Sequence, residues 1–170
     1  MAEKKLEGAG LRGQVAGQTA LSTVGKEGKG LTYRGYAIEE LSEKASFEEV
    51  AYMLLYGNLP NQSELIEYKE KLKKYRELPS ELKKVLELIP ASAHPMDVLR
   101  TGCSFLGNIE PEGDFSNQAD IADRLISVFP SVVCYWYRYS HDEVSIETAS
   151  DHDSCLLYTS DAADDGSRVG

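Results

Sequence analysis

The stretch His94–Gly107 constrains the fold most, because its sequence HPMDVLRTGCSFLG marks both ends of a helix. Pro95 suits the first helical position, where its missing N–H leaves no bond unmade, so His94 is predicted to be the N-cap. Asp97 falls in the first turn, where the helix dipole favours a carboxylate, and Gly107 is predicted to end the helix in a left-handed conformation. One face carries apolar residues and another carries small ones: Met96, Leu99, Cys103 and Leu106, and Thr101, Gly102 and Ser104. The stretch therefore predicts a central helix that packs against other helices.

Capping signals predict four further helices around this one. A Ser or Asn placed three residues before an acidic residue can cap a helix, Gly can end it, and Pro can bound it at either end. The marking residues are Ser46, Glu49 and Gly57; Asn61 and Glu64; Pro79 and Pro90; and Asn117 and Asp120. The last pattern runs towards Tyr139 and should bend at Pro130. Its second half is so apolar that we expect it to be covered on most sides, by more chain than these 170 residues supply.

Apolar stripes predict which faces of the first two of these helices are buried. The inward residues are Phe47, Val50, Ala51, Leu54 and Leu55 in the first helix, and Leu65, Tyr68, Leu72 and Tyr75 in the second. Glu67 with Lys71 and Glu70 with Lys74 are spaced to form ion pairs along the outside of the second helix. The basic run KEKLKKYR is therefore interpreted as a solvated face rather than an anion-binding patch.

Two glycine-rich stretches near the N-terminus do not have the context of a phosphate-binding loop. Gly8, Gly10 and Gly13 are spaced as G-x-G-x-x-G, but no strand precedes them and no good helix follows. The stretch Gly25–Gly30 is followed by Leu31 rather than the lysine that a phosphate loop needs. Its flanks, ALSTV and LTYR, predict a small hairpin that turns through GKEGKG. We interpret residues 1–18 as a flexible arm and residues 19–154 as a helical domain.

Composition excludes several classes of partner. The chain of 170 residues is the size of one domain, and its 28 acidic and 18 basic residues give a net charge of -10. This charge disfavours nucleic acid and anionic membrane surfaces. No apolar run reaches the roughly 20 residues that span a bilayer, and the N-terminus lacks the apolar stretch of a signal peptide. The sequence has an odd number of cysteines, Cys103, Cys134 and Cys155, and their spacing is not that of metal ligands. We therefore expect no disulfide and no bound metal, and a cytoplasmic location.

Three stretches carry a resemblance to a known family: HPMDVLRTGCSFLG, LTYRGYAIEELSEKASFEEVAYMLLYGNLP and YWYRYSH. They resemble the N-terminal part of the citrate synthase family, over residues 10–154, and within it most closely the 2-methylcitrate synthases. The resemblance implies a mainly α-helical large domain, present in part, with a small N-terminal β-hairpin, in an enzyme that is a homodimer. It also implies the condensation of oxaloacetate with propionyl-CoA, or alternatively with acetyl-CoA. The acyl-CoA is a substrate, and no cofactor is expected.

The resemblance places no catalytic residue and no substrate ligand on this chain. The family supplies its catalytic groups, two histidines and an aspartate, from its second half, so this chain alone is expected to be inactive. Five residues lie inside the family pattern and are interpreted as structural, acting in packing, hairpin docking or subunit contacts. They are Arg34, Gly35, His94, Pro95 and Arg100.

The remaining chemically reactive residues form no recognisable site. His141 and His152 lie in an acidic stretch, but their spacing matches no established metal site, so a solvated connection is the favoured interpretation. Neither Cys103 nor Cys134 has a basic neighbour that would clearly lower its pKa and make it a nucleophile.

The C-terminal stretch differs in character from the rest of the chain. Cys155–Asp165, with the sequence CLLYTSDAADD, resembles the translation of a sequencing adapter, so we interpret residues 155–170 as an artefactual, disordered tail. A rival hypothesis of another class is a non-enzymatic helical interaction domain that docks a partner through Tyr135–Tyr139.

Overall fold

The computed structural model describes residues 17–25 and 30–142 of the chain. It contains two compact units, Met1–Lys44 and Ala45–Gly170. The boundary between them was not predicted, because the sequence around Ala45 continues a helical pattern without a linker composition. The predicted arm falls largely outside the described residues, and the predicted tail and His152 fall wholly outside them.

The first unit has a small antiparallel sheet followed by one helix. Strands β1 (Ser22–Thr23), β2 (Thr32–Tyr33) and β3 (Tyr36–Ala37) lie in that order, and helix α1 (Ile38–Lys44) follows. Pairing of β1 with β2 confirms the predicted hairpin, although residues 26–29 of its connection lie outside the described part. Strand β3 was not predicted.

The turn between β2 and β3 consists of Arg34 and Gly35, which both have positive φ angles, of 50° and 93°. Two such residues form the type I′ turn that suits the right-handed twist of a two-residue hairpin. The N–H of Arg34 donates to the carbonyl oxygen of Leu21 at 2.8 Å, which ties this turn to the neighbouring strand. Arg34 and Gly35 therefore lie at a hairpin turn.

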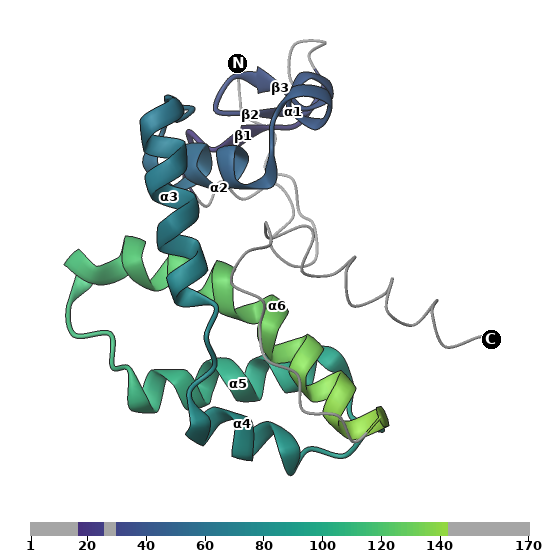
Figure 1. Ribbon diagram of the computed structural model, residues 1–170. Coiled ribbons are helices and arrows are strands. Elements are labelled where there is room, and N and C mark those ends of the chain that lie inside the picture. Colours follow the sequence, from purple (N-terminus) through teal and green to yellow (C-terminus); the bar gives the residue numbers. More distant parts are fainter. Residues whose placement is uncertain (1–16, 26–29, 143–170) are drawn as a thin grey trace, which may run out of the picture. The chain divides into compact units, whose positions relative to one another are not determined.

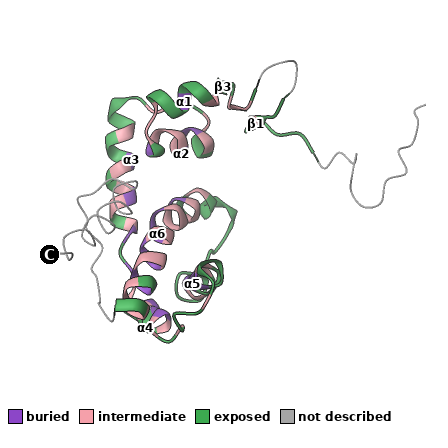
Figure 2. Cartoon of the chain, turned by 90° about the vertical axis from the view of Figure 1, so that its right-hand side faces the viewer, coloured by how far each residue is buried: buried purple, intermediate pink, exposed green. Residues whose placement is uncertain are grey.

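The second unit is helical throughout. Its elements are α2 (Phe47–Tyr56), α3 (Gln62–Tyr75), α4 (Ser80–Glu87), α5 (Pro95–Ile109), the short 3₁₀ helix η2 (Phe115–Asn117) and α6 (Gln118–Asp142). Helix α6 packs against α3, α4 and α5, with α2 and α3 on one side of it and α4 and α5 on the other (Figures 1 and 2). The mainly helical fold with a small sheet confirms the predicted fold class.

Local capping chemistry explains where these helices begin. Ser46 and Asn61 form the two predicted capping boxes, each accepting a backbone N–H while the glutamate three residues on accepts the N–H of the cap. His94 caps α5 through Nδ1, which accepts the N–H of Met96 at 3.2 Å. Gly57 ends α2 in the left-handed conformation with φ of 104°, as predicted.

The larger apolar core lies between α4, α5 and the second half of α6 (Figure 2). Its buried members are Leu78, Leu82, Leu86, Val98, Leu106, Val128, Val132, Tyr135 and Trp136. Tyr135 and Trp136 belong to this core and are therefore not available to dock a partner, whereas Tyr137 of the same run is 49% exposed.

Helix α5 differs from its prediction in its end and in its buried face. It runs through Gly107 to Ile109, because Glu110 provides the cap and donates its N–H to the carbonyl of Leu106 at 2.7 Å. The predicted inward residue Met96 is 63% exposed. The buried face is the row Val98, Gly102 and Leu106, which includes Leu106 of the predicted apolar face and Gly102 of the predicted small face. Gly102 sets this face, because its missing side chain lets α5 approach Val132 of α6.

Helix α3 buries Tyr68 and Leu72 of its predicted stripe, whereas α2 departs from its prediction. Phe47 and Leu55 are exposed, whereas Glu48 and Met53 are buried, since α2 packs mainly on α3 rather than on a large core. Lys71 does not pair with Glu67 but reaches α6, where a buried carboxylate is a stronger partner than an exposed one. Glu70 pairs with Lys73 at 3.2 Å instead of with Lys74.

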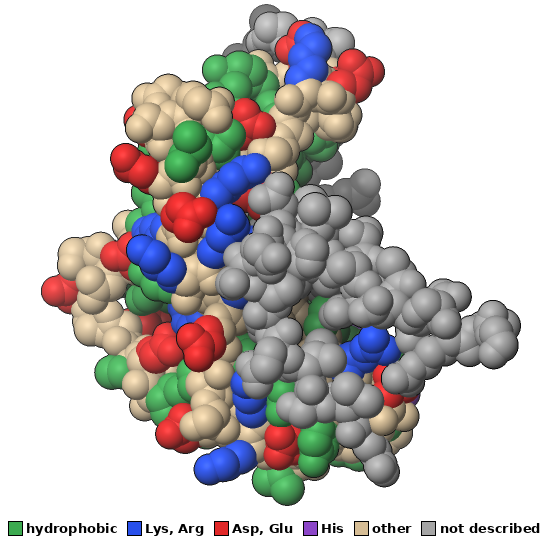
Figure 3. Space-filling view, in the orientation of Figure 1, with side chains coloured by type: hydrophobic (Ala, Val, Ile, Leu, Met, Phe, Trp, Pro, Cys, Tyr) green, Lys and Arg blue, Asp and Glu red, His purple; other side chains and the backbone are tan. Residues whose placement is uncertain are grey.

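Charged side chains of both signs are interspersed along α3 (Figure 3), as expected for a solvated face. Helix α6 continues through Pro130 and changes direction along its length (Figure 1). Within residues 17–25 and 30–142, no helix is both long enough and apolar enough to cross a membrane.

Candidate functional site

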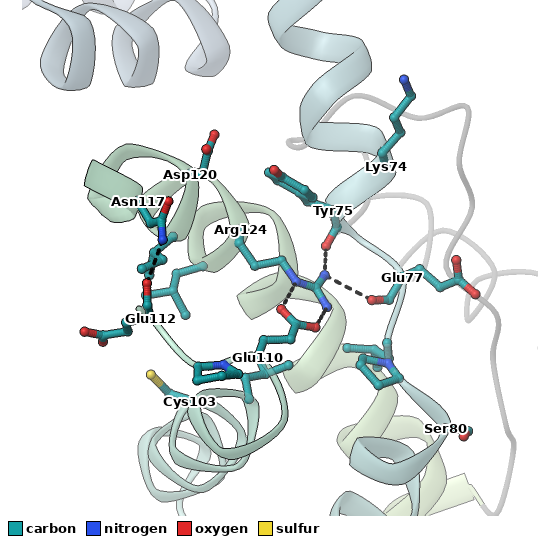
Figure 4. Close-up of a pocket in the computed structure, with 17 residues that line it drawn as sticks. Lys74, Tyr75, Glu77, Ser80, Cys103, Glu110, Glu112, Asn117, Asp120 and Arg124 are labelled. Carbon is teal, nitrogen blue, oxygen red and sulfur yellow. Dashed lines mark hydrogen bonds and ion pairs between the residues drawn. The ribbon is translucent and has the colours of Figure 1, made fainter. Parts of the chain in front are cut away.

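A groove of about 820 Å³ lies in the helical unit (Figure 4). It is bounded by the end of α3 with the segment that follows it, the second half of α5, and the first turns of α6. Its apolar surface comes from Leu78, Pro79, Leu106, Pro111, Ile121 and Leu125. A hollow of this size could hold a small ligand, so its chemistry decides whether it is a functional site.

Arg124 occupies the middle of this groove and is already bonded on several sides (Figure 4). Its Nε and Nη2 donate to the two carboxylate oxygens of Glu110, at 3.0 and 2.9 Å. Its Nη1 donates to the carbonyl oxygens of Tyr75 and, at 3.1 Å, of Glu77. Carbonyls at the end of a helix have no partner inside the helix, and Arg124 supplies one to the end of α3. With four of its five N–H groups used, Arg124 is a structural connector rather than a ligand for an anion.

The charges around the groove do not suit an anionic ligand. Four carboxylates line it against two cations: Glu77, Glu110, Glu112 and Asp120 against Lys74 and Arg124. Two carboxylates of oxaloacetate or the phosphates of coenzyme A would meet an excess of like charge here. The lining contains no histidine, and Cys103 is a half-buried thiol without a neighbouring base in the lining. The groove thus offers carboxylates, two cations and one thiol, and no histidine among its lining residues.

A second polar cluster is centred on Asp123, which is fully buried in α6. Its carboxylate accepts hydrogen bonds from Tyr56 at 2.5 Å, from Tyr68 at 2.9 Å and from Lys71 at 2.6 Å. Lys71 also pairs with Asp120 at 2.6 Å. The cluster joins α2, α3 and α6 through hydrogen bonds in which one partner is charged.

The pKa values in this cluster are shifted away from proton transfer near neutral pH. Burial raises the pKa of Tyr68 and of Tyr56, and the adjacent Asp123 carboxylate raises both further. Partial burial alone lowers the pKa of Lys71, but hydrogen bonds to Asp120 and Asp123 outweigh it, so the pKa of Lys71 is also raised. Each of these groups holds its proton more firmly than usual. The cluster therefore joins α2, α3 and α6 through protonated donors around one carboxylate.

The structure places four of the five family-pattern residues at a hairpin turn and a helix start, and the fifth, Arg100, within α5. Arg34 and Gly35 form the β2–β3 turn, and His94 with Pro95 begins α5. Arg100 is exposed on α5 and pairs with Asp97 at 3.1 Å. Arg34 and Gly35 belong to the first unit, and the other three belong to the second.

His141 lies at the end of α6, where it stacks on Tyr137 with ring centroids 4.2 Å apart. This contact gives it a packing role. No group of three or more His, Cys, Asp or Glu residues able to hold a metal ion occurs in residues 17–25 and 30–142.

Neither Asp123 nor Arg124 was predicted from the sequence. The signal for them was two adjacent charges, DR, inside the otherwise apolar pattern IADRLISV of the longest helix. Charged residues are seldom fully buried unless they are paired, so their positions indicated partners on other helices. The identity of those partners depended on the tertiary packing.

Comparison with known proteins identifies the family. The family model described as citrate synthase, C-terminal domain, matches residues 10–165. A 2-methylcitrate synthase from Shewanella oneidensis is 65% identical over 150 residues, which are 88% of this chain and 40% of that relative. The chain therefore spans about two fifths of the length of this relative.

Solved structures agree with this result. A citrate synthase from Thermotoga maritima superposes with a TM-score of 0.74 at 36% identity, over 85% of this chain and 38% of its own. A citrate synthase from Thermoplasma acidophilum, in a ternary complex with carboxymethyl coenzyme A and oxaloacetate, has a TM-score of 0.81 at 22% identity. It covers 91% of this chain and 41% of its own, and it supports the fold alone. The family model matches most residues of this chain, which shows that the chain belongs to the citrate synthase family.

Proposed function

We propose that the protein condenses oxaloacetate with propionyl-CoA and water, releasing 2-methylcitrate and coenzyme A. The observation that carries this proposal is the 65% identity to a relative named 2-methylcitrate synthase. The acyl-CoA is consumed as a substrate, so the proposal needs no cofactor, and we propose a cytoplasmic homodimer as its assembly.

The contribution of this chain is a helical scaffold. Condensation needs a carboxylate base for a weakly acidic C–H, a donor for the enolate oxygen and a second donor for the ketone. The groove around Arg124 has more carboxylates than cations in its lining, and the Asp123 carboxylate is held by three donors. We propose that the chain alone does not condense the substrates, and that the reacting groups come from the part of the enzyme that the relatives have beyond the matched residues.

A chimaera tests whether this chain can serve that role. The matched 150 residues of the Shewanella oneidensis relative are replaced by those of this chain, and oxaloacetate-dependent release of coenzyme A from propionyl-CoA is followed with a thiol reagent. We expect the chimaera to retain activity within about tenfold of its parent, because the scaffold contacts no reacting atom. A folded chimaera without activity would contradict the proposal. The 170-residue chain is assayed in parallel, and turnover by it above the blank would contradict the scaffold role.

A second candidate function is the condensation of acetyl-CoA. It is favoured by the Thermotoga maritima structure, which is named a citrate synthase and is 36% identical. Discrimination of one methylene in a pocket amounts to roughly 10- to 200-fold in kcat/KM. The two acyl donors are therefore compared with the enzyme expressed from the complete reading frame of the source gene. A kcat/KM for acetyl-CoA above that for propionyl-CoA would replace the first proposal by the second.

A further inference from the structure

The helical unit contains two separate groups of buried apolar residues. The larger core, between α4, α5 and the second half of α6, includes no residue of α2 or α3. The smaller one contains three buried residues, Ala51, Tyr68 and Leu72, with Tyr52 and Ile126 packed at its edge. Only Ile126 in this group comes from α6. The apolar cluster that α2 and α3 share with α6 is therefore smaller than the larger core, although Met53 of α2 is also fully buried.

Hydrogen bonds and an ion pair also join α2 and α3 to α6. Asp123 of α6 accepts from Tyr56 at the end of α2, and from Tyr68 and Lys71 of α3. The carboxylate is fully buried and is the shared acceptor of these three donors. A neutral amide in its place would turn one acceptor into a buried donor, while Lys71 would keep its pair with Asp120. One side chain thus carries bonds to both helices.

The chain has a defined pivot at the C-terminal end of α3, one turn beyond Lys71. Arg124, the residue after Asp123, donates to the carbonyl oxygens of Tyr75 and Glu77 and is itself held by Glu110. Leu78, which follows directly, is already part of the larger core. The end of α3 is thus fixed to α5 and α6, independently of the Asp123 contacts.

We propose that α2 and α3 form a hairpin that opens from α6 as one unit, about the segment held by Arg124, while α4, α5 and the second half of α6 stay folded. The Asp123 carboxylate is the latch that keeps this hairpin closed. Such partial opening is expected where a segment shares few buried apolar contacts with its neighbours. The device is a conformational one and does not depend on the proposed reaction.

Hydrogen exchange of the 170-residue chain, followed by mass spectrometry, tests the proposal. In Asp123→Asn, amides of residues 47–75 should exchange on the order of a hundredfold faster, because the buried amide NH2 would face three other donors and the ion pair with Lys71 would be lost. Amides of residues 80–109 and 128–142 should change by less than about threefold. Asp120→Asn is the matched control, since Asp120 bonds the same lysine but is exposed and bonds neither tyrosine. It should accelerate exchange by less than about tenfold.

Three results would overturn the proposal. One is unchanged exchange of residues 47–75 in Asp123→Asn, and another is equal acceleration in all helices. The third is an effect of Asp120→Asn as large as that of Asp123→Asn. If Asp123→Asn does not fold, the same exchange measurement is made on Tyr68→Phe. This variant removes one donor to Asp123 and leaves the Asp123 carboxylate charged. Acceleration confined to residues 47–75 in that variant supports the latch, and uniform acceleration or none refutes it.

Discussion

Two glycines of α5 should respond in opposite directions to the same substitution. Gly102 is buried against α6, and a Cβ added there would lie 3.0 Å from Cγ1 and 3.5 Å from Cγ2 of Val132. Gly107 lies more than one turn later, is exposed, and a Cβ added to it would meet nothing within 4 Å. Gly107→Ala is therefore a matched control for Gly102→Ala in the same helix.

The expected magnitudes follow from two opposing effects. Alanine is favoured over glycine in a helix interior by about 0.8 to 1 kcal/mol, so Gly107→Ala should stabilise the protein by up to that amount. The same gain applies at Gly102, but overpacking costs about 1 to 3 kcal/mol. Val132 is fully buried and β-branched, so its side chain has little freedom to move away. Gly102→Ala should therefore destabilise the protein by about 1 kcal/mol net.

Urea unfolding followed by far-UV circular dichroism measures both free energies of unfolding. The two variants should differ by about 2 kcal/mol, with opposite signs relative to the parent. In Gly102→Ala combined with Val132→Ala, the destabilisation should be smaller than the sum of the two single effects, because the shorter side chain makes room for the new methyl group. Stabilisation of Gly102→Ala to the same extent as Gly107→Ala would refute the close approach of α5 and α6.

Three further changes have defined outcomes. Ser46→Ala should lower the free energy of unfolding by about 1 kcal/mol through loss of the capping box, and Ser80→Ala, whose hydroxyl caps no helix, should have a smaller effect in the same thermal melt. Leu86→Ala should cost about 2 to 5 kcal/mol in urea unfolding because Leu86 is fully buried, whereas Leu88→Ala, at an exposed site, should stay within about 0.5 kcal/mol. Above about pH 10 the free energy of unfolding should fall, because the raised pKa values of Tyr68, Tyr56 and Lys71 make the folded state keep protons that the unfolded state releases. Urea titrations at increasing pH should show a shallower fall in Tyr68→Phe, and an unchanged slope in that variant would contradict the assignment.

The features that the sequence predicted correctly are those decided within a few residues. Ser46 and Asn61 cap their helices through a partner three positions away, and His94 through a partner two positions away, so the pattern contains the whole interaction. Gly57 ends α2 for a similarly local reason, a backbone conformation that glycine adopts readily. The number and order of the helices in the second unit followed from these signals.

The features that it missed depend on residues far away in the chain. Gly107 resembled a helix end, but the end of α5 is set by Glu110, whose side chain is held by Arg124 fourteen positions later. Lys71 had a suitable glutamate one turn away, yet it pairs with a carboxylate 52 positions along the chain. A local sequence pattern indicates which charged residues are close enough to pair within a helix. It contains no information on which charged residue of another helix will be buried beside them.

Asp123 and Arg124 together show how one short polar sequence can organise an apolar helix. Adjacent residues on a helix point about 100° apart, so two neighbouring side chains reach different surroundings. Asp123 reaches the side chains of α2 and α3, whereas Arg124 reaches the end of α3 and the cap of α5. The apolar residues of α6 pack against any surface of the right size, but these two charges each require particular donors or acceptors. We infer that the apolar residues of α6 hold the unit together, and that this charged pair decides where α3 lies against it.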